Sequence, residues 1–137
     1  CGNGLLTLAH YQMSDQTNNC YVLTDDSWVA CQAAQQNLER ANPDICAEVL
    51  HSDALTEANG SFDWVLCNPP FHTGHKVQTD TATRMFAQAK QMLSPKGRLL
   101  IVANRHLPYG TALKKLFGGY QILATNRQFT LFLTQKA

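Results

Sequence analysis

Two spacings of apolar residues alternate along this chain of 137 residues. Apolar positions three or four residues apart predict amphipathic helices, and short runs rich in β-branched and aromatic residues predict strands. The helices are expected at 5–13, 28–41, 81–93 and 111–117. The strands are expected at 20–24, 46–50, 64–67, 99–103, 120–124 and 129–134.

Capping residues and helix breakers mark the ends of these helices. Ser27 and Asp80 stand where the second and third helices begin, and both residue types are good N-caps. Asn42-Pro43 and Ser94-Pro95 should end those helices because proline cannot continue one. Gly118-Gly119 should end the last helix.

Strands that alternate with helices and close with a strand pair indicate an α/β fold, with a mostly parallel sheet and helices on both faces. Ligands gather at the carboxyl ends of the strands in such a sheet. Five groups of polar or conformationally special residues lie at those ends: residues 2–4, Asp25, Asp53, 68–71 and 104–106. Their convergence predicts a binding site there.

The chain opens on a glycine-rich turn, Cys1-Gly2-Asn3-Gly4, that feeds the first helix. Such a turn normally follows a strand, and none precedes it in this sequence. We therefore expect 1–137 to be one domain with its first strand missing or truncated, in a longer chain with a further domain upstream. The length suffices to bury a core.

Composition excludes several classes of protein. Charged residues make up 15% and apolar residues 45% of the chain, as in a water-soluble globular protein. It has no apolar run of 18 residues and no secretion signal, so we expect a cytoplasmic monomer without membrane contact. The five cysteines are widely spaced and lack a Cys-x-x-Cys pair, so we interpret them as small apolar fillers.

Charge is divided unevenly along the chain although the net charge is only +1. Residues 1–75 contain one basic and nine acidic residues, whereas 76–137 contain ten basic residues and one acidic residue. The basic half suits a polyanion, because Lys and Arg contacts with phosphate dominate nucleic-acid affinity. A basic surface kept for solubility is the alternative.

Candidate phosphate contacts in the basic half are Arg105, His106 and Arg127, with Lys114-Lys115 nearby in sequence. Lys114-Lys115 can also be the solvated face of a short helix. A base in a duplex must leave its stack to reach a protein pocket, so a single strand or loop is the easier substrate.

The segment Asn68-Pro69-Pro70-Phe71 ends a strand in a stiff extended ledge, because proline cannot donate to a sheet ladder and restricts the residue before it. The ledge presents hydrogen-bond acceptors. An exocyclic amine of a nucleobase is a poor nucleophile, and two acceptors on its protons favour the tetrahedral, positively charged nitrogen of a transition state. Phe71 can pack on the base and His72 can contact it. A simple surface turn is the alternative.

The glycine-rich turn and two carboxylates fit a bound adenosine. Gly2 and Gly4 let backbone approach a ligand closely, and Asp25 lies where a carboxylate can bind ribose hydroxyls. Asp53 can accept a hydrogen bond from an adenine amine, with Ala54 supplying backbone. A nicotinamide dinucleotide is the alternative, but a third glycine is lacking and the Asn-Pro-Pro-Phe ledge has no use in hydride transfer.

Metal binding is not expected from this sequence. His72, His75 and His106 lack the spacing of a recognised metal site, and His75 reads as an ordinary loop residue.

Four segments together resemble one protein family. They are Val65-Leu66-Cys67-Asn68-Pro69-Pro70-Phe71-His72, Ile101-Val102-Ala103-Asn104-Arg105-His106-Leu107 with Tyr109, Leu113-Lys114-Lys115 with Phe117-Gly118, and Ala124-Thr125-Asn126. They resemble the C-terminal catalytic domain of the bacterial rRNA guanine-N2 methyltransferases of the RsmC/RlmG family, over nearly the whole chain. The Asn104-Arg105-His106-Leu107 stretch is more similar to the large-subunit (23S) enzyme than to the small-subunit (16S) one.

The resemblance implies a class I, seven-stranded Rossmann-like methyltransferase fold, S-adenosylmethionine as methyl donor and a guanine amine of ribosomal RNA as acceptor. It also implies an upstream degenerate copy of the fold that helps to bind RNA. Asn68 would hold the amine with the Pro69 carbonyl, Pro70 would stiffen the ledge, and Phe71 would stack on the guanine. Alternatives are methylation of DNA adenine or protein glutamine, and an RNA-binding module without turnover.

The implied cofactor contacts gather the residues already singled out. They are Cys1, Gly2, Asn3, Gly4, Asp25, Asp53, Ala54 and Asn68. The implied substrate contacts are His72, Arg105, His106 and Arg127.

Overall fold

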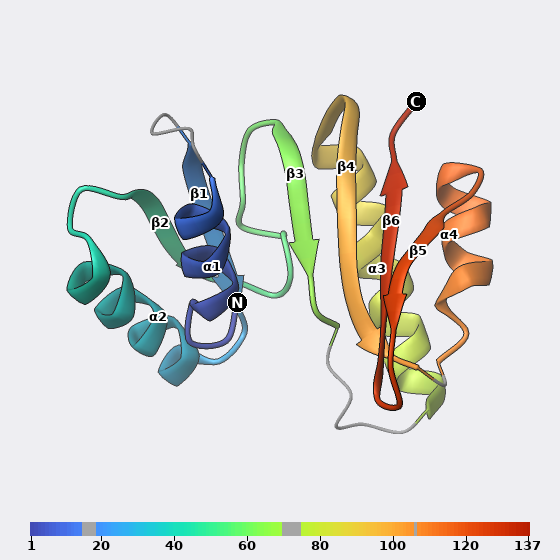
Figure 1. Cartoon of the computed structure of the whole chain (residues 1–137), viewed down its shortest axis with the longest axis horizontal. Coiled ribbons are helices and arrows are strands. Elements are labelled where there is room, and N and C mark those ends of the chain that lie inside the picture. The colour runs from blue at the N-terminus through green and yellow to red at the C-terminus, as the bar shows by residue number, and fades with distance from the viewer. Residues whose placement is uncertain (15–18, 70–74, 106) are drawn as a thin grey trace. The chain divides into compact units, whose positions relative to one another are not determined.

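The computed structural model describes residues 1–14, 19–69, 75–105 and 107–137, and the chain divides into two compact units, 1–58 and 59–137 (Figure 1). The first unit contains α1 (Leu5–Met13), β1 (Cys20–Asp25), α2 (Trp28–Ala41) and β2 (Cys46–His51). The second contains β3 (Phe62–Cys67), α3 (His75–Met92), β4 (Leu93–Asn104), α4 (Tyr109–Phe117), β5 (Gln121–Thr125) and β6 (Phe129–Gln135).

In the first unit, β1 and β2 pair in parallel and α2 packs against both strands. Leu23 of β1 is buried with Ala34 and Leu38 of α2, and Leu8 of α1 and Val49 of β2 pack against these three residues. Fully burying a leucine side chain stabilises a fold by about 1.5–3 kcal/mol, so this cluster fixes the helices on the strands.

Local chemistry sets the helix ends as expected from the sequence. The Ser27 hydroxyl caps α2 by accepting a hydrogen bond of 3.2 Å from the Ala30 N–H. Asn42 ends the same helix, and its N–H donates to the Leu38 carbonyl at 3.0 Å. Gly118 ends α4 with a φ of 86°, a left-handed conformation that glycine adopts without a steric penalty.

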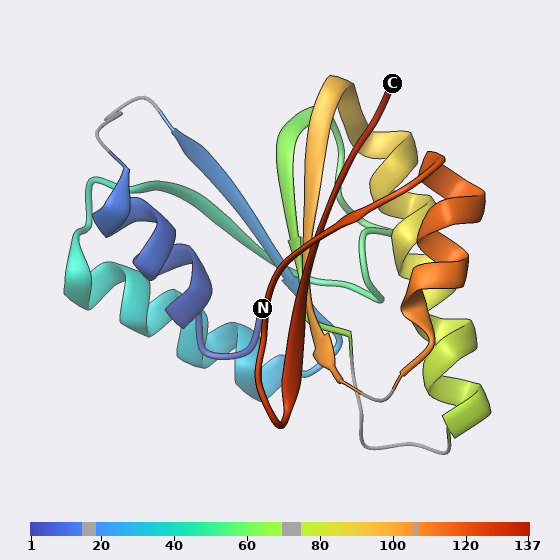
Figure 2. The ribbon, with the colours of Figure 1, turned by 45° about the vertical axis from the view of Figure 1, so that its right-hand side comes forward.

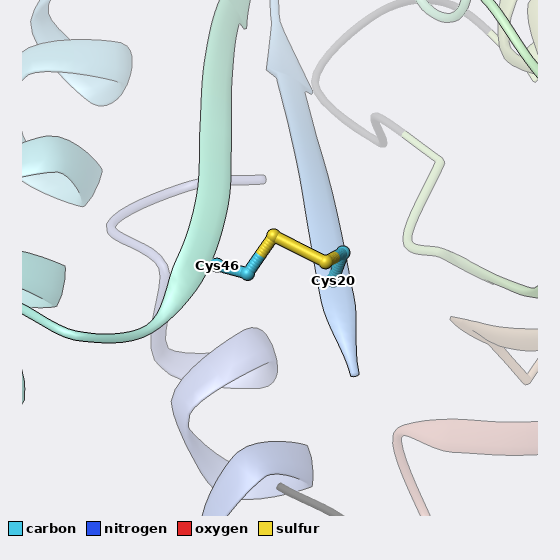
Figure 3. The surroundings of a disulfide bond; sticks show 2 residues. All are labelled: Cys20 and Cys46. Carbon is cyan, nitrogen blue, oxygen red and sulfur yellow. A yellow bond between two sulfur atoms is a disulfide. The ribbon is translucent and has the colours of Figure 1, made fainter. Parts of the chain in front are cut away.

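A disulfide joins Cys20 and Cys46, the first paired residues of β1 and β2 (Figure 3). Interpreting all five cysteines as apolar fillers was therefore wrong for this pair. The parallel register brings the two Cα atoms to 4.7 Å, a proximity that a separation of 26 residues in sequence does not reveal. Cys31 and Cys67 are buried and fit the filler interpretation, whereas Cys1 is exposed.

The second unit is a four-stranded sheet in the order β3-β4-β6-β5. β3 and β4 are parallel, and the other two pairings are antiparallel. α3 and α4 lie side by side on one face of this sheet (Figures 1 and 2). The largest fully buried side chains of this unit are Phe86, Leu99, Ile101, Tyr109 and Leu113.

The third helix differs from its predicted limits. α3 begins at His75, so Asp80 is an interior helix residue and does not cap it. The helix ends at Met92, and β4 begins at once with Leu93, so Ser94-Pro95 lies inside the strand as defined by its hydrogen bonds. The register shifts here, and Lys96 has a φ of 65°. Proline ends the helix as expected, but the chain returns through a bulge without a separate loop.

The α/β class of the fold is confirmed, but its expected seven strands are not. The described residues contain six strands in two hydrogen-bonded sheets, with two parallel and two antiparallel pairings. Within those same residues, none of the helices has the length and apolar character needed to span a bilayer.

Candidate functional site

In the first unit, the Asp25 carboxylate joins the end of β1 to the glycine-rich turn. Its Oδ2 accepts hydrogen bonds of 2.9 Å from the Gly2 N–H and from the amine of Cys1. Its Oδ1 accepts one of 2.9 Å from the Ser27 N–H. The residue predicted to contact ribose thus also organises the turn predicted to contact the rest of the cofactor.

The glycines of this turn have distinct roles. Gly4 is buried, has a φ of 84° and precedes α1, and its carbonyl accepts a hydrogen bond of 3.0 Å from Leu8. A Cβ at Gly4 would lie 3.3 Å from the Ala34 backbone, so glycine permits α1 to start against α2. Gly2 has a φ of 54° and nothing crowds it, which leaves backbone open to a ligand. The Asn3 carbonyl accepts a hydrogen bond of 2.9 Å from the Asn37 amide.

Asp53 follows β2 at the same edge as Asp25, because the two parallel strands end together. The Ser52 N–H donates to the Asp25 carbonyl at 2.9 Å, and the buried Ser52 hydroxyl accepts from the Glu57 N–H at 3.0 Å. The Asp53 side chain is exposed, and Ala54 adopts a left-handed φ of 53°. The structure therefore brings together the glycine turn, Asp25, Asp53 and Ala54.

The ionisation of Asp25 reflects opposing effects. Burial would raise the pKa of its carboxyl, but hydrogen bonds that include those from the Ser27 and Gly2 N–H groups outweigh burial and leave the pKa below its usual value. Asp25 is consequently a stable anion at neutral pH. An anion accepts hydrogen bonds from hydroxyl groups, as a ribose contact requires.

Two residues at this edge were not anticipated from the sequence. His51 is the last residue of β2, and its Nε2 donates to the Asp26 carbonyl at 2.9 Å. Its ring meets that of Trp28 edge to face, with centroids 5.6 Å apart, and Trp28 is 59% exposed. The sequence signal that could have pointed to this contact is a tryptophan, Trp28, at the exposed first position of an otherwise amphipathic helix.

In the second unit, the ledge begins as the sequence predicts. β3 ends at Cys67, Asn68 is exposed, and Pro69 is buried. Cys67 is buried behind Asn68, and this burial raises the pKa of its thiol to about 12. Pro70, Phe71 and His72 lie outside the described residues, so their predicted roles stay predictions.

Arg105 holds the turn between β5 and β6. Its N–H donates to the Gln128 carbonyl at 2.8 Å, and its guanidinium donates to the Asn126 carbonyl at 3.5 Å. The Asn126 side chain in turn accepts from the N–H groups of Gln128 and Phe129 at 2.8 and 2.7 Å. Arg127 is exposed on this turn. Arg105 thus contacts the turn that carries Arg127, and His106 lies outside the described residues.

The parallel pairing of β3 with β4 places Cys67 opposite Ile101. Both strands therefore run toward one edge of the sheet, where Asn68 follows β3, and β4 continues past Ile101 to Asn104 before Arg105. The predicted ledge and the predicted phosphate contact share that edge. Across the residues that the structure describes, no group of three or more His, Cys, Asp or Glu side chains could hold a metal ion.

Comparison with known proteins identifies the family. A family model for the methyltransferase small domain matches residues 1–133. The chain belongs to this family. This chain is 41% identical over 137 residues to the ribosomal RNA large subunit methyltransferase G of Pseudomonas putida (strain W619). It is 36% identical over 140 residues to that of Serratia proteamaculans (strain 568). These matches cover 99% and 100% of this chain, but this chain spans only 36% of the length of each relative.

Solved structures agree with the sequence comparison. This chain matches the structure of the T. thermophilus 16S rRNA N2 methyltransferase RsmC, in complex with AdoMet and guanosine, with a TM-score of 0.84 and 30% identity. The match covers 99% of this chain and 35% of that one. A ribosomal protein L11 methylase from Lactobacillus delbrueckii matches with a TM-score of 0.75 at 20% identity, over 99% of this chain and 66% of that chain, which shows the fold alone. The expected methyltransferase fold is confirmed.

Proposed function

We propose that this methyltransferase small domain transfers a methyl group from S-adenosylmethionine to the exocyclic N2 amine of a guanine in ribosomal RNA. One observation carries the proposal: the chain matches, over 99% of its length, the structure of an rRNA N2 methyltransferase in complex with AdoMet and guanosine. The relatives named as large-subunit methyltransferases favour 23S over 16S RNA as substrate. An rRNA substrate would place this activity in the cytoplasm.

The first unit has residues that fit the methyl donor. Gly2 leaves backbone open for the amino acid portion of the cofactor, Gly4 shapes the same turn, and Asp53 with Ala54 suits the adenine. Asp25 Oδ1 accepts one hydrogen bond from the protein, so a second acceptor position on that oxygen can take a ribose hydroxyl. When bound, the cofactor supplies a methyl group already activated on a sulfonium sulfur.

The second unit has the groups that suit the acceptor. The Asn68 side-chain oxygen and the Pro69 carbonyl would accept the two protons of the guanine amine. This arrangement favours the pyramidal nitrogen that develops as the new N–C bond forms, more than the planar amine of the ground state. The methylated nitrogen then carries a positive charge and loses its proton to water, so no dedicated base is needed. Phe71 would stack on the guanine.

Orientation then accounts for most of the rate gain, because the donor needs no further activation. Arg105 and Arg127 would bind RNA phosphates beside the ledge and fix the position of the guanine. They have the exposure and charge that this role requires.

The proposal is tested by offering the protein labelled S-adenosylmethionine with deproteinised 23S rRNA, deproteinised 16S rRNA, intact ribosomal subunits or DNA. The expected product is N2-methylguanosine in 23S rRNA. Methylated adenine in DNA or methylglutamine in a ribosomal protein would instead identify another acceptor. Cofactor binding without any methylated product would indicate an RNA-binding module without turnover.

A further inference from the structure

A groove of about 440 Å³ lies between α4 and the strands β5 and β6, within the second unit. Arg105 and Pro108 line one part of it, Lys114 lines the helix side, and Tyr120 and Ile122 line the strand side. Figure 1 shows α4 next to β5 at this border of the sheet. Arg105, the predicted phosphate contact, therefore also lines this groove.

The Tyr120 ring is held firmly on the strand side of this groove. It meets the Phe132 ring edge to face, with centroids 5.3 Å apart. It also covers Gly110 of α4, where an added Cβ would lie 2.8 Å from Tyr120 Cζ. Only glycine leaves room for the ring at that helix position. Because its position is fixed by packing, Tyr120 can support a planar ligand at a small entropic cost.

The charges of the groove favour an anion. The Lys114 ammonium lies 5.9 Å from the centroid of the Tyr120 ring, in the range of a cation–π contact. Arg105 supplies a second positive group, and none of the described residues that line the groove is acidic. The unit as a whole, 59–137, contains ten Lys and Arg against two Asp and Glu. A neutral peptide would use the apolar lining alone and an acidic side chain the charges alone, whereas a nucleotide offers a phosphate to the charges and a planar base to the ring.

We propose that this groove binds one nucleotide of single-stranded RNA that flanks the target guanosine. Its phosphate contacts Arg105 and Lys114, and its base packs against Tyr120 and Ile122. The groove begins at Arg105, which follows β4 at the edge where Asn68 follows β3, so a strand held at the ledge can continue into it. This inference rests on the proposed function, because it takes the RNA substrate from it.

The test compares two neighbouring lysines of α4 in the whole chain. Lys114 lines the groove, whereas Lys115 is also exposed, carries the same charge and does not line it. The variants Lys114→Gln and Lys115→Gln are titrated with a short fluorescent single-stranded RNA that contains one guanosine, at several salt concentrations. Circular dichroism and S-adenosylmethionine affinity verify that both variants keep the fold of the parent.

Lys114→Gln should weaken RNA binding several-fold and reduce the slope of log affinity against log salt by about 0.7, the value for one lost contact with a single strand. Lys115→Gln should change affinity less than about two-fold, because exposed charges away from the ligand are screened. Tyr120→Leu should weaken binding by about five-fold or more through the loss of base stacking.

Equal effects of the two lysine variants would overturn the proposal, because a diffuse basic surface would then explain the affinity. Unchanged RNA affinity in both variants would overturn it too, because the RNA would then bind without using the groove. Methyl transfer is measured in the same preparations. A clear Lys114 effect without N2-methylguanosine would refute the proposed function alone, and N2-methylguanosine without a Lys114 effect would refute the groove alone.

Discussion

The carboxylate of Asp25 accepts a hydrogen bond of 2.9 Å from the backbone N–H of Gly2. This contact joins the end of β1 to the turn before α1, residues that lie 23 positions apart in sequence. The Asp25 side chain thus shapes the glycine-rich turn, and in the proposed function the same side chain binds a ribose hydroxyl. Folding and cofactor binding should therefore be affected together when Asp25 is changed.

Asp25→Asn should lower the free energy of unfolding by about 1–3 kcal/mol, the worth of hydrogen bonds to a charged group. It should also weaken S-adenosylmethionine binding about ten-fold or more. Asp26→Asn is the matched control, since Asp26 is the next residue and is exposed. Denaturant titration and calorimetric cofactor titration measure the two effects. Equal behaviour of the two variants would contradict the role given to Asp25.

The acid dependence of stability has a defined sign at Asp25. Because the folded-state pKa lies below the usual value of 3.8, the unfolded chain binds the proton first as pH falls. The carboxylate thus stabilises the fold above about pH 4 and loses this effect as pH falls through the folded pKa. Wild-type protein should lose more stability than Asp25→Asn over that interval in denaturant titrations.

The disulfide between Cys20 and Cys46 should stabilise the first unit. Closing a loop with a sequence separation of 26 residues restricts the unfolded chain by roughly 3 kcal/mol. In the absence of reductant, the double variant Cys20→Ser/Cys46→Ser should be less stable than wild type by up to that amount. Adding a reductant should remove most of the difference. A difference that persists undiminished in reductant would mean that packing, and not the disulfide, is responsible.

Cys67 should make the protein sensitive to alkali. Its pKa is about 12 in the folded state, because burial disfavours the thiolate, against 9.0 for an exposed thiol. Between these values the unfolded state loses its proton first, so stability falls as pH rises above about 9. Burial also raises the pKa of Tyr109, which adds to the effect at higher pH.

Cys67→Ala should show a weaker decline in unfolding free energy between pH 9 and pH 10 than wild type. Cys31→Ala offers a comparison in the first unit, where burial raises the pKa of the thiol as well. An identical decline in wild type and Cys67→Ala would exclude Cys67 as a source of the alkaline sensitivity.

Much of the fold could be predicted because local signals and spacing agree. The Ser27 cap, the Asn42 stop and the Gly118 stop each depend on residues within one helical turn, and each is observed. Asp80 misled because a good capping residue can also stand inside a helix when packing extends that helix toward its N-terminus. Buried Ala82, Phe86 and Ala89 hold α3 on the sheet, and this tertiary packing outweighs the preference of one side chain.

The site was predictable only to the level of strand ends. Knowing that parallel strands end together was enough to group Asp25 with Asp53, and Asn68 with Arg105. The disulfide, the His51 contact with Asp26 and the groove at Tyr120 depend on register and on side-chain packing between distant segments. Sequence spacing carries no information about these three features, so they required the structure.

Substitution of Asn68 tests whether this residue holds the guanine amine during methyl transfer. Wild-type protein and Asn68→Ala are mixed with labelled S-adenosylmethionine and deproteinised 23S rRNA, and the methylated nucleoside is identified after digestion. We predict N2-methylguanosine with wild type, a rate at least about 100-fold lower with Asn68→Ala, and unchanged folding, because the lost contact acts mainly in the transition state. Wild-type rates in the variant, or a methylated nucleoside other than N2-methylguanosine, would contradict the account.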